Sequence, residues 1–582
     1  MKNLEKTTKM FLISIVLVCI TTSIFAVPAL STNFGSNGRN NIKNVIVLVP
    51  DGCSQSIETL ARWYKGEPLN IDPIITGSVE TWMADSVITD SAPAATAFAT
   101  GQKSSNGFIS VGPKTSNLLT GYTPNAASYV PLATVLEASK LQGKATGLIA
   151  TSTISHATPA AYAAHNHNRG DEQDIIEQMV YNDVDVVFGG GAAMLFPKNQ
   201  NYTTSFGANW TGTRNDGENL LDTLTSRGYK FVDSQTSLNA LRSGKAWGLF
   251  APSSMQPDMD RTMFAPNEPS LAEMTKKAIQ LLSKDRDGFF LMVEGSQVDW
   301  ADHANDPIYD VTDFLAFDDA VGVALDFAKK DGQTLVMAFP DHNCGGLTIG
   351  SYYQDKNAIG HSYTATTIED VVNPLKGMQV TSTGLAKLVA GKTNAETRDI
   401  INQYWSLSLT LDDIEAIKAL TVASSKRAAV SLDYAISEYV CQKYTVFGWT
   451  THGHTGEDVP LWAWGPKDSA PVGHYDNTDM AKIAADTLGL SLSRTQSKLY
   501  VNVTAAFKPN QWILNTTDPA NPVLQFTLNG KTAYLPISKD VMTVQYSNGY
   551  TKTFNLEGLV IRAPMINSNQ VFVPQQVITI LK

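Results

Sequence analysis

The chain has 582 residues and a formal net charge of −11, with 43% hydrophobic and 17% charged residues. This length allows one large domain with a smaller one beside it, and the composition is that of a globular protein rather than a disordered one. The negative charge argues against a nucleic-acid partner, because neutralising phosphates takes a surplus of Lys and Arg. It does not exclude a small phosphorylated ligand, which one local cluster of cations could bind.

Residues 1–26 have the pattern of a signal peptide. Lys2, Lys6 and Lys9 precede an apolar run over residues 11–25, and Ala26 is a candidate cleavage site. Because the run is short for a membrane span, a cleaved signal is the first interpretation and an uncleaved anchor is the alternative. Both predict an exported protein that is secreted, periplasmic or attached to the cell surface.

Only Cys53, Cys344 and Cys441 follow this segment, which excludes a disulfide scaffold. Cys53 and Cys344 follow Asp51 and Asp341 at similar offsets. A disulfide between them is one hypothesis, and two small buried thiols are the other.

Apolar segments that end on polar residues recur along the chain, over residues 44–49, 144–153, 183–188, 288–293, 334–340 and 446–449. Segments with helical spacing lie between them, at residues 131–141, 270–282 and 311–330. This alternation predicts an α/β fold with a doubly wound, mainly parallel sheet and helices on both faces. Ligand sites in such sheets lie beyond the carboxyl ends of the strands, where the polar residues gather here.

The predicted catalytic domain covers residues 43–492 and contains a helical insertion, residues 345–446, near the active face. Residues 494–582 have short alternating runs separated by Asn-Gly turns, for example a predicted strand at 498–503, and we interpret them as a β-rich C-terminal module. Because this module has no cluster of catalytic residue types, we expect a chain ending near Ser493 to keep its activity.

The densest group of candidate metal ligands lies at residues 294–303. Asp299 and His303 are four residues apart, so they share a helix face and can bind one ion, and Asp341-His342 forms a second pair. Mixed oxygen and imidazole ligands suit zinc, and oxygen ligands alone suit magnesium. A single Asp-His pair is usually a surface feature, but its recurrence after several predicted strands favours a metal centre.

Ser91 begins a predicted helix over residues 92–100, with Pro93 in the first turn. Free backbone N–H groups at that end favour an anion. A single serine there is more often only an N-cap, and it becomes a nucleophile candidate where a metal or base lowers its pKa.

Six blocks of the sequence resemble the alkaline phosphatase family, in the family's order: VPDG, TDSAPAATAFATG, HATPAAYAAHNHNR, EGSQVDWADHAND, PDHNCGG and HTGEDVP. The resemblance implies a secreted, metal-dependent phosphomonoesterase that takes phosphate monoesters, releases inorganic phosphate and uses two Zn²⁺ and one Mg²⁺.

The resemblance also implies a role for each matching residue. Ser91 corresponds to the nucleophile that becomes phosphoserine, Arg169 to the phosphate-binding arginine, and Asp90 to its support. The implied metal ligands are, for one zinc, Asp51, Asp341 and His342; for the other zinc, Asp299, His303 and His454; and for magnesium, Asp51, Thr158 and Glu294.

Two positions depart from the best-known bacterial members of that family, which carry Asp and Lys where this chain has His156 and Trp300. His156 replaces a carboxylate behind the ligands of the third site, so we expect weaker Mg²⁺ binding. Trp300 replaces an ammonium near the phosphate, so phosphate affinity is expected to differ as well. His454 is preferred to His452 as a ligand because it directly precedes Thr-Gly-Glu-Asp-Val. The other histidines considered are expected to be surface or hydrogen-bonded residues: His165, His167, His361 and His474.

Two other functions stay open. One is a related hydrolase of the same superfamily that acts on phosphodiesters or sulfates, and the other is a metal-stabilised surface-binding protein without turnover. The full set of expected ligands disfavours the second. A homodimer, and a contact of residues 494–582 with the cell envelope, are further hypotheses.

Overall fold

The computed structural model describes residues 42–351, 363–425, 427–565 and 568–582. The predicted signal peptide and His361 lie outside these residues. Within the described ranges, no helix combines the length and the apolar character that crossing a bilayer requires.

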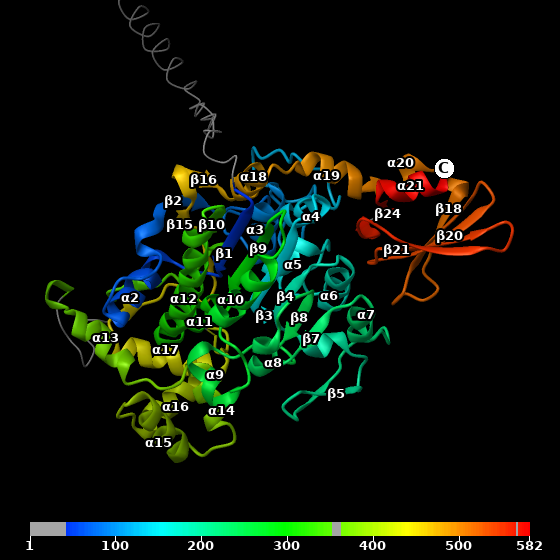
Figure 1. Ribbon diagram of the computed structural model, residues 1–582. Helices are drawn as coiled ribbons and strands as arrows, with labels where there is room; N and C mark the ends of the chain where they lie inside the picture. Colours follow the sequence, from blue (N-terminus) through cyan, green and yellow to red (C-terminus); the bar gives the residue numbers. More distant parts are fainter. Residues whose placement is uncertain (1–41, 352–362, 426, 566–567) are drawn as a thin grey trace, which may run out of the picture. The chain divides into compact units, whose positions relative to one another are not determined.

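The described strands include a ten-stranded central sheet (Figure 1). Its order is β16 (Gly473–Asp476), β2 (Ile75–Glu80), β15 (Val459–Trp464), β10 (Thr334–Ala338), β1 (Asn44–Pro50), β9 (Phe289–Gly295), β3 (Ala145–Thr153), β4 (Val186–Gly190), β8 (Ala246–Leu249) and β7 (Lys230–Val232). Among these strands β15 alone pairs antiparallel with its neighbours. The predicted α/β fold with a mainly parallel sheet is confirmed.

Helices cover both faces of the sheet. On one face α12 (Pro307–Asp331) packs on β1, β9 and β10, and α10 (Leu271–Leu282) packs on β3 and β4. On the other face α4 (Val135–Leu141), α5 (Ala157–Ala163) and α18 (Asn477–Leu488) contact β1, β3 and β9, with α3 (Ser91–Thr100) packed on α5 and α18. All seven residues of β1 are therefore buried, as its continuous apolar sequence predicts.

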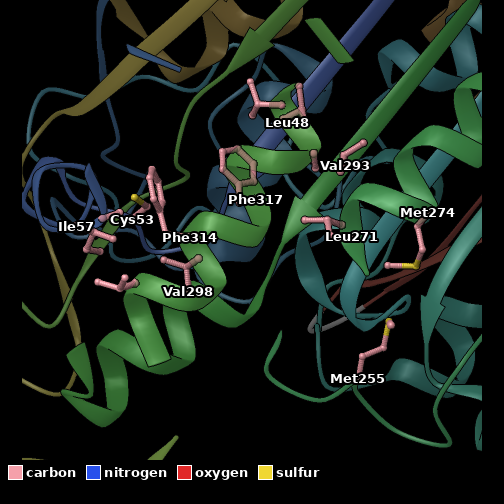
Figure 2. Packing of buried hydrophobic residues seen from close by; sticks show 14 of the residues in the cluster. Leu48, Cys53, Ile57, Met255, Leu271, Met274, Val293, Val298, Phe314 and Phe317 are labelled. Carbon is pink, nitrogen blue, oxygen red and sulfur yellow. The ribbon is translucent and has the colours of Figure 1, made fainter. Parts of the chain in front are cut away.

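The main core lies between the sheet and α12, α10, α2 (Gln55–Lys65) and α11 (Gln297–Ala304). Figure 2 shows Leu48 of β1 and Val293 of β9 facing Phe317 of α12 and Leu271 of α10. Burying a side chain of this size contributes about 1.5–3 kcal/mol. This packing fixes β1 and β9, whose carboxyl ends carry predicted ligands.

The predicted insertion forms five described helices: α13 (Ile368–Lys376), α14 (Ser382–Val389), α15 (Asn394–Trp405), α16 (Leu411–Leu420) and α17 (Leu432–Tyr444). Helix α17 packs on α11, where the Ser437 hydroxyl donates to the Ala304 carbonyl and the Cys441 thiol donates to the Asn305 carbonyl at 3.4 Å. The insertion thereby supports the helix that carries Asp299 and His303.

The C-terminal region contains a five-stranded antiparallel sheet: β18 (Trp512–Asn515), β19 (Val523–Leu528), β20 (Lys531–Pro536), β21 (Val541–Tyr546) and β22 (Thr551–Asn555). Beside it, β17 (Val501–Asn502), β24 (Ser568–Val573) and β23 (Ile561–Met565) form a smaller sheet, and α21 (Gln575–Leu581) ends the chain. Asn529 and Gly530 have φ of 51° and 70°, the left-handed pair that a tight hairpin requires.

Two sequence predictions are wrong in detail. The strand predicted at residues 498–503 is reduced to β17 (Val501–Asn502), because α19 (Leu492–Leu499), capped by Ser491, extends to Leu499. The apolar segment 446–449 gives only β13 (Phe447–Gly448), which pairs with β12 (Thr348–Ile349) outside the central sheet. Of the two hypotheses for Cys53 and Cys344, the structure supports the second: in the described part of the chain Cys53, Cys344 and Cys441 are buried free thiols.

The core packing can be tested with Phe314→Ala on α12, since Phe314 is fully buried. We expect a loss of about 3–5 kcal/mol in the free energy of unfolding, from lost transfer energy and the cavity left behind. Phe206→Ala is the matched control, because Phe206 is 38% exposed and should cost about 1 kcal/mol or less. Both variants are unfolded in denaturant without metals, which would stabilise the native state. Equal losses would contradict this view of the core.

Candidate active site

Four neighbouring strands bring their carboxyl ends together at one edge of the sheet, in the order β10, β1, β9, β3. Asp341 and His342 follow β10, Asp51 follows β1, Glu294 lies in β9, and Thr158 lies just beyond β3. The predicted gathering of polar residues at this edge is therefore present, and it joins residues more than two hundred positions apart.

Asp299, His303 and His454 form a first group of candidate ligands. The Nε2 atom of His303 lies 3.4 Å from Oδ2 of Asp299, and Nε2 of His454 lies 3.6 Å from Oδ1. Asp299 and His303 share one face of α11, as their spacing predicts. His454 comes from β14 (His454–Thr455), which pairs with β11 (Asn343–Cys344) rather than with the central sheet.

Backbone carbonyls fix which nitrogens these two imidazoles offer. Nδ1 of His303 faces the carbonyl of His452, and Nδ1 of His454 lies 2.8 Å from the carbonyl of Thr89. A carbonyl only accepts, so Nδ1 carries the proton in each ring and Nε2 offers a lone pair. The two Nε2 atoms are 3.2 Å apart, a distance that requires a cation or a proton between them.

Asp51, Asp341 and His342 form a second group. Nε2 of His342 lies 3.2 Å from Oδ2 of Asp341 and 3.5 Å from Oδ1 of Asp51, and all three side chains are fully buried. Backbone N–H groups of Gly52 and His342 donate to Oδ1 of Asp341 at 3.1 and 3.0 Å, which leaves Oδ2 facing the imidazole.

Gly52 is required where β1 turns into the site. Its φ is +71°, and a Cβ there would lie 2.7 Å from the Cα of Asp299. Both the left-handed backbone and this close approach exclude a side chain.

Asp51, Glu294 and His156 form a third group, with one ligand atom of each lying within 4.8 Å of the others. Thr158 lies in the first turn of α5 and is also fully buried. His156 is predicted to lie behind the ligands, and in the structure its ring also lies within reach of an ion held by Asp51 and Glu294.

The pKa values in these groups reflect a shortage of positive charge. Burial and the neighbouring carboxylates, first among them Asp341, raise the pKa of Asp51 well above its usual range. Burial raises the pKa of Glu294 to about 7 and that of Asp341 to about 6. A bound cation would favour the ionised form of these carboxyls and would lower their pKa values.

The first group has the opposite balance. Burial alone would raise the pKa of Asp299, but the hydrogen bond and charge of His303 lower it below its usual range. Burial by itself would lower the pKa of His303, but the hydrogen bond and charge of Asp299 outweigh burial and raise this pKa to about 9. For His342, burial and the charge of His454 lower the pKa to about 3, so its ring is neutral and can act as a ligand.

Several buried oxygens of these side chains have no hydrogen-bond partner among the described residues. They are Oδ1 and Oδ2 of Asp51, Oγ1 of Thr158, Oε1 of Glu294, Oδ1 of Asp299 and Oδ2 of Asp341. Leaving such groups unpaired is costly, and metal coordination is one way to satisfy them. The donor set therefore fits metal ions: imidazole and carboxylate in the first two groups, and mostly oxygen in the third.

Ser91 and Arg169 lie beside these groups. Oγ of Ser91 is 3.2 Å from Nε2 of His342. Ser91 is the first residue of α3, and Asp90, not Ser91, is the N-cap, accepting from the N–H of Ala92 at 3.4 Å. The serine hydroxyl is therefore free of the capping role that its position would otherwise suggest.

Arg169 is held from two sides. Its Nη1 donates to Oδ1 of Asp90 at 2.5 Å, the contact expected of Asp90, and its Nη2 donates to Nε2 of His156 at 2.9 Å. Trp300 packs edge-on against His156, with 6.0 Å between ring centroids. The two positions that depart from the best-known bacterial pattern thus touch each other, and one of them touches the arginine.

The remaining described histidines lie outside the three groups. His452 binds Glu438 at 3.3 Å, His165 is buried between Glu137 and Tyr500, and exposed His474 contacts Glu80. His167 packs against Phe108.

Sequence reasoning missed Cys344, whose thiol lies with Asp299, His303 and His454. Its position two residues after His342 was the available signal.

Comparison with known proteins gives a consistent result. The family model described as alkaline phosphatase matches residues 42–490. Alkaline phosphatase 3 of Bacillus subtilis (strain 168) is 36% identical over 475 residues, which cover 78% of this chain and 91% of that protein.

Solved structures agree. The crystal structure of Thermus thermophilus alkaline phosphatase has a TM-score of 0.67 and 25% identity, covering 78% of this chain and 92% of the other. A variant of the alkaline phosphatase from the Antarctic bacterium TAB5, with a histidine replaced by aspartate and Mg bound in its M3 site, has a TM-score of 0.51 and 26% identity, covering 78% and 99%. The chain belongs to the alkaline phosphatase family of phosphate monoester hydrolases.

Proposed function

We propose that the enzyme is exported and hydrolyses phosphate monoesters through a phosphoserine on Ser91, with two Zn²⁺ and one Mg²⁺ bound. The observation that carries the proposal is the 3.2 Å contact between Oγ of Ser91 and Nε2 of His342, inside a cluster of buried carboxylates and imidazoles. A serine in that environment can lose its proton, whereas a serine that merely begins a helix, with no metal or base beside it, cannot readily do so.

Asp51, Asp341 and His342 would hold one zinc, and Asp299, His303 and His454 would hold the other. Asp51, Thr158 and Glu294 would hold magnesium, with His156 close enough to compete as a ligand. When bound, the ions supply Lewis-acid chemistry, lowering the pKa of oxygens that they coordinate and stabilising charge on the leaving oxygen.

The chain's own residues bind and orient the phosphate. Arg169 offers a planar guanidinium that can contact two phosphate oxygens, and Asp90 keeps it in place through the 2.5 Å contact. Backbone N–H groups in the first turn of α3 add positive potential around Ser91. The Oγ atom of Ser91 attacks phosphorus, the ester oxygen leaves, and water later releases inorganic phosphate from the serine.

The covalent step is tested with Ser91→Ala. We expect the loss of most turnover, because the nucleophile is gone, while metal content and phosphate binding are kept. Wild-type enzyme quenched in acid after incubation with phosphate should show a mass increase of one phosphoryl group on the peptide that contains Ser91. Thr100→Ala, on the same helix and away from the ligands, is the matched control. A phosphoryl group on another residue would contradict the proposal.

The bond specificity is tested by comparing p-nitrophenyl phosphate, bis-p-nitrophenyl phosphate and p-nitrophenyl sulfate. The expected result is a kcat/KM for the monoester that exceeds the other two by several orders of magnitude. Only the monoester dianion offers the charge and free oxygens that two cations and Arg169 can contact together. A diester or sulfate rate equal to the monoester rate would favour the alternative hydrolase function.

The third site should bind Mg²⁺ weakly in the wild type. Mg²⁺ prefers octahedral oxygen coordination and retained water, whereas His156 offers nitrogen and no negative charge. We expect His156→Asp to tighten Mg²⁺ about 10–100-fold, and excess Zn²⁺ to inhibit the wild type more than the variant. In the related TAB5 enzyme, a variant with a histidine replaced by aspartate has Mg bound in its M3 site.

The measurement is a Mg²⁺ titration of activity on protein stripped of metal and reloaded with two equivalents of zinc. His474→Asp is the control, because His474 is exposed and lies outside the ligand groups. If the wild type saturates at a lower Mg²⁺ concentration than His156→Asp, the argument about His156 is wrong.

Export rests on the signal-like sequence of residues 1–26. A homodimer, and a contact of residues 494–582 with the cell envelope, remain predictions from the sequence. Size-exclusion chromatography and fractionation of cells would check them.

A further inference from the structure

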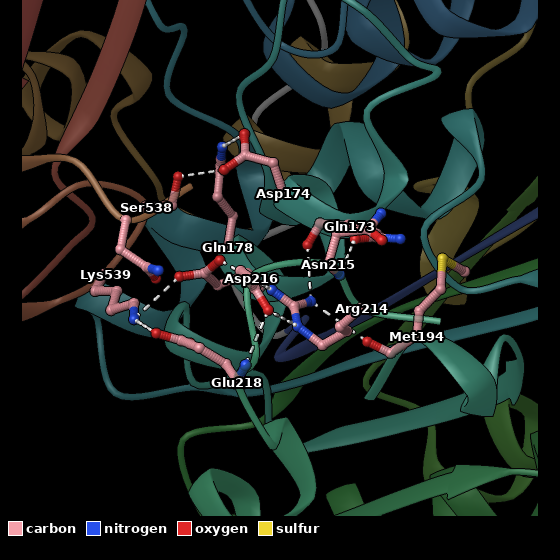
Figure 3. A network of polar contacts seen from close by, with 12 residues as sticks. Gln173, Asp174, Gln178, Met194, Arg214, Asn215, Asp216, Glu218, Ser538 and Lys539 are labelled. Atoms are coloured by element: carbon pink, nitrogen blue, oxygen red, sulfur yellow. Dashed lines mark hydrogen bonds and ion pairs between the residues drawn. The ribbon is translucent and has the colours of Figure 1, made fainter. Parts of the chain in front are cut away.

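The C-terminal region contacts the catalytic part through the turn between β20 and β21. Figure 3 shows Lys539 of this turn reaching Glu218, and Ser538 reaching Asp174 of α6 (Glu172–Tyr181). The nearby carboxylates Glu177, Asp216 and Glu218 lie within 4.8 Å of one another. They are no cation site, because Arg214 and Lys539 already pair with them.

Ser538 touches a residue that holds the Arg169 loop, which we define as residues 164–171 between α5 and α6. The Ser538 hydroxyl, in a residue only 4% exposed, donates to Oδ1 of Asp174 at 2.6 Å. The other oxygen of that carboxylate accepts from Nδ2 of Asn166 at 2.9 Å and from Nε2 of Gln178 at 3.0 Å. Ser538 is thus connected to Asn166 of the loop through a single intervening side chain, that of Asp174.

Tyr500 touches the same loop from another direction. Its hydroxyl lies 2.6 Å from Nε2 of His165 and also binds Oε1 of Glu137, and these three side chains are buried. His165 contacts the carbonyl of Ser110 through Nδ1 at 2.9 Å, and its backbone N–H donates to Oε1 of Gln178 at 2.7 Å. Both ring nitrogens of His165 therefore have hydrogen-bond partners, and the Tyr500 hydroxyl is one of the partners of Nε2.

These contacts lead directly to the arginine. His165 and Asn166 precede Arg169 by four and three residues. The loop is also joined to residues 107–109, where Asn166 N–H donates to the Ile109 carbonyl at 2.9 Å and Arg169 N–H donates to the Gly107 carbonyl at 2.8 Å. Because Arg169 lies on a loop and not at a strand end, its position depends on such contacts.

We propose that Tyr500 and Ser538, from the C-terminal region, are positioning residues for phosphate that act by fixing the Arg169 loop. This role rests on the proposed function of Arg169 in binding phosphate. Removing the Ser538 hydroxyl takes the donor from Oδ1 of Asp174, a buried carboxylate oxygen. Removing the Tyr500 hydroxyl takes one of the two partners from Nε2 of His165, which keeps only its 3.0 Å contact with Glu137. Small displacements of a phosphate-binding arginine reduce transition-state and phosphate binding strongly. On this proposal a chain ending near Ser493 loses both contacts, contrary to the expectation from sequence.

The test uses the full-length holoenzyme with Tyr500→Phe, Ser538→Ala and the double variant. The readouts are the competitive inhibition constant of inorganic phosphate, KM and kcat for p-nitrophenyl phosphate, metal content and Tm. We expect the phosphate inhibition constant to rise about threefold to tenfold in each single variant and further in the double variant, with metal content unchanged.

Arg227→Met is the matched control. Arg227 binds Asp540 of the same turn at 3.2 Å, so its loss removes a different link between this turn and the catalytic part and leaves the Ser538–Asp174 bond in place. None of the contacts that hold the Arg169 loop involves Arg227. We expect this variant to lower Tm as much as Tyr500→Phe does while the phosphate inhibition constant stays within twofold. The same rise in that constant for Arg227→Met would show a general loss of stability and overturn the proposal.

Arg169→Ala distinguishes the positioning role of Tyr500 and Ser538 from the phosphate-binding role of Arg169. If Tyr500 acts through Arg169, Tyr500→Phe has no further effect on the phosphate inhibition constant in the Arg169→Ala background. An additive effect there would overturn the positioning role, as would unchanged phosphate binding in both C-terminal variants while Arg169→Ala binds weakly. Unchanged phosphate binding in Arg169→Ala itself would instead overturn the function proposed for the arginine, and the positioning role with it.

Discussion

The crowding of buried charge around Asp51 is the constraint on which the rest of the site depends. Asp51 directly follows the central strand β1, is fully buried, and shares its surroundings with Glu294, Asp341 and Asp299. Carboxylates so close together cannot all stay ionised in a dry site unless cations lie between them. The strand order β10, β1, β9, β3 creates this crowding, because it places the ends of four ligand-bearing segments side by side.

Crowded carboxylates alone would only destabilise the fold. Other features of the site arrange its ligand atoms so that they can bind cations. The carbonyls of Thr89 and His452 direct the lone pairs of two imidazoles toward each other, and Gly52 allows the backbone to pass within contact of Asp299. The insertion supports α11 from behind through α17. The metal ligands are therefore fixed by strands and helices, whereas Arg169 is fixed by a loop, which explains why side chains from the C-terminal region matter for that residue.

The sequence predicted the elements whose signal is local. Continuous apolar segments gave β1, β9 and β10, the i, i+4 spacing gave the shared helix face of Asp299 and His303, and Asn529-Gly530 gave a hairpin. The order of six motif blocks then predicted which residues meet. The three ligand groups contain the metal ligands named in advance, with Thr158 lying buried nearby. The structure adds His156 and Cys344 to these groups.

Features that depend on distant contacts could not be predicted. His454 reaches the site from a two-residue ladder with Cys344, not from a core strand, because a short apolar segment carries no information about its partner. His156 faces Asp51 and Arg169 together, which only the fold decides. Tyr500 and Ser538 lie in a region without catalytic residue types, so their contacts with His165 and Asp174 have no signal in composition or spacing.

The central claim is that cations occupy the crowded carboxylate site, and anomalous X-ray diffraction from crystals of the active enzyme tests it most directly. Data collected on the two sides of the zinc absorption edge should show two strong peaks, one between His303 and His454 and one beside His342, both of which weaken sharply below the edge. A third density without a zinc signal should lie beside Asp51 and Glu294. Crystals of fully active enzyme that show no metal density at these positions would contradict the account.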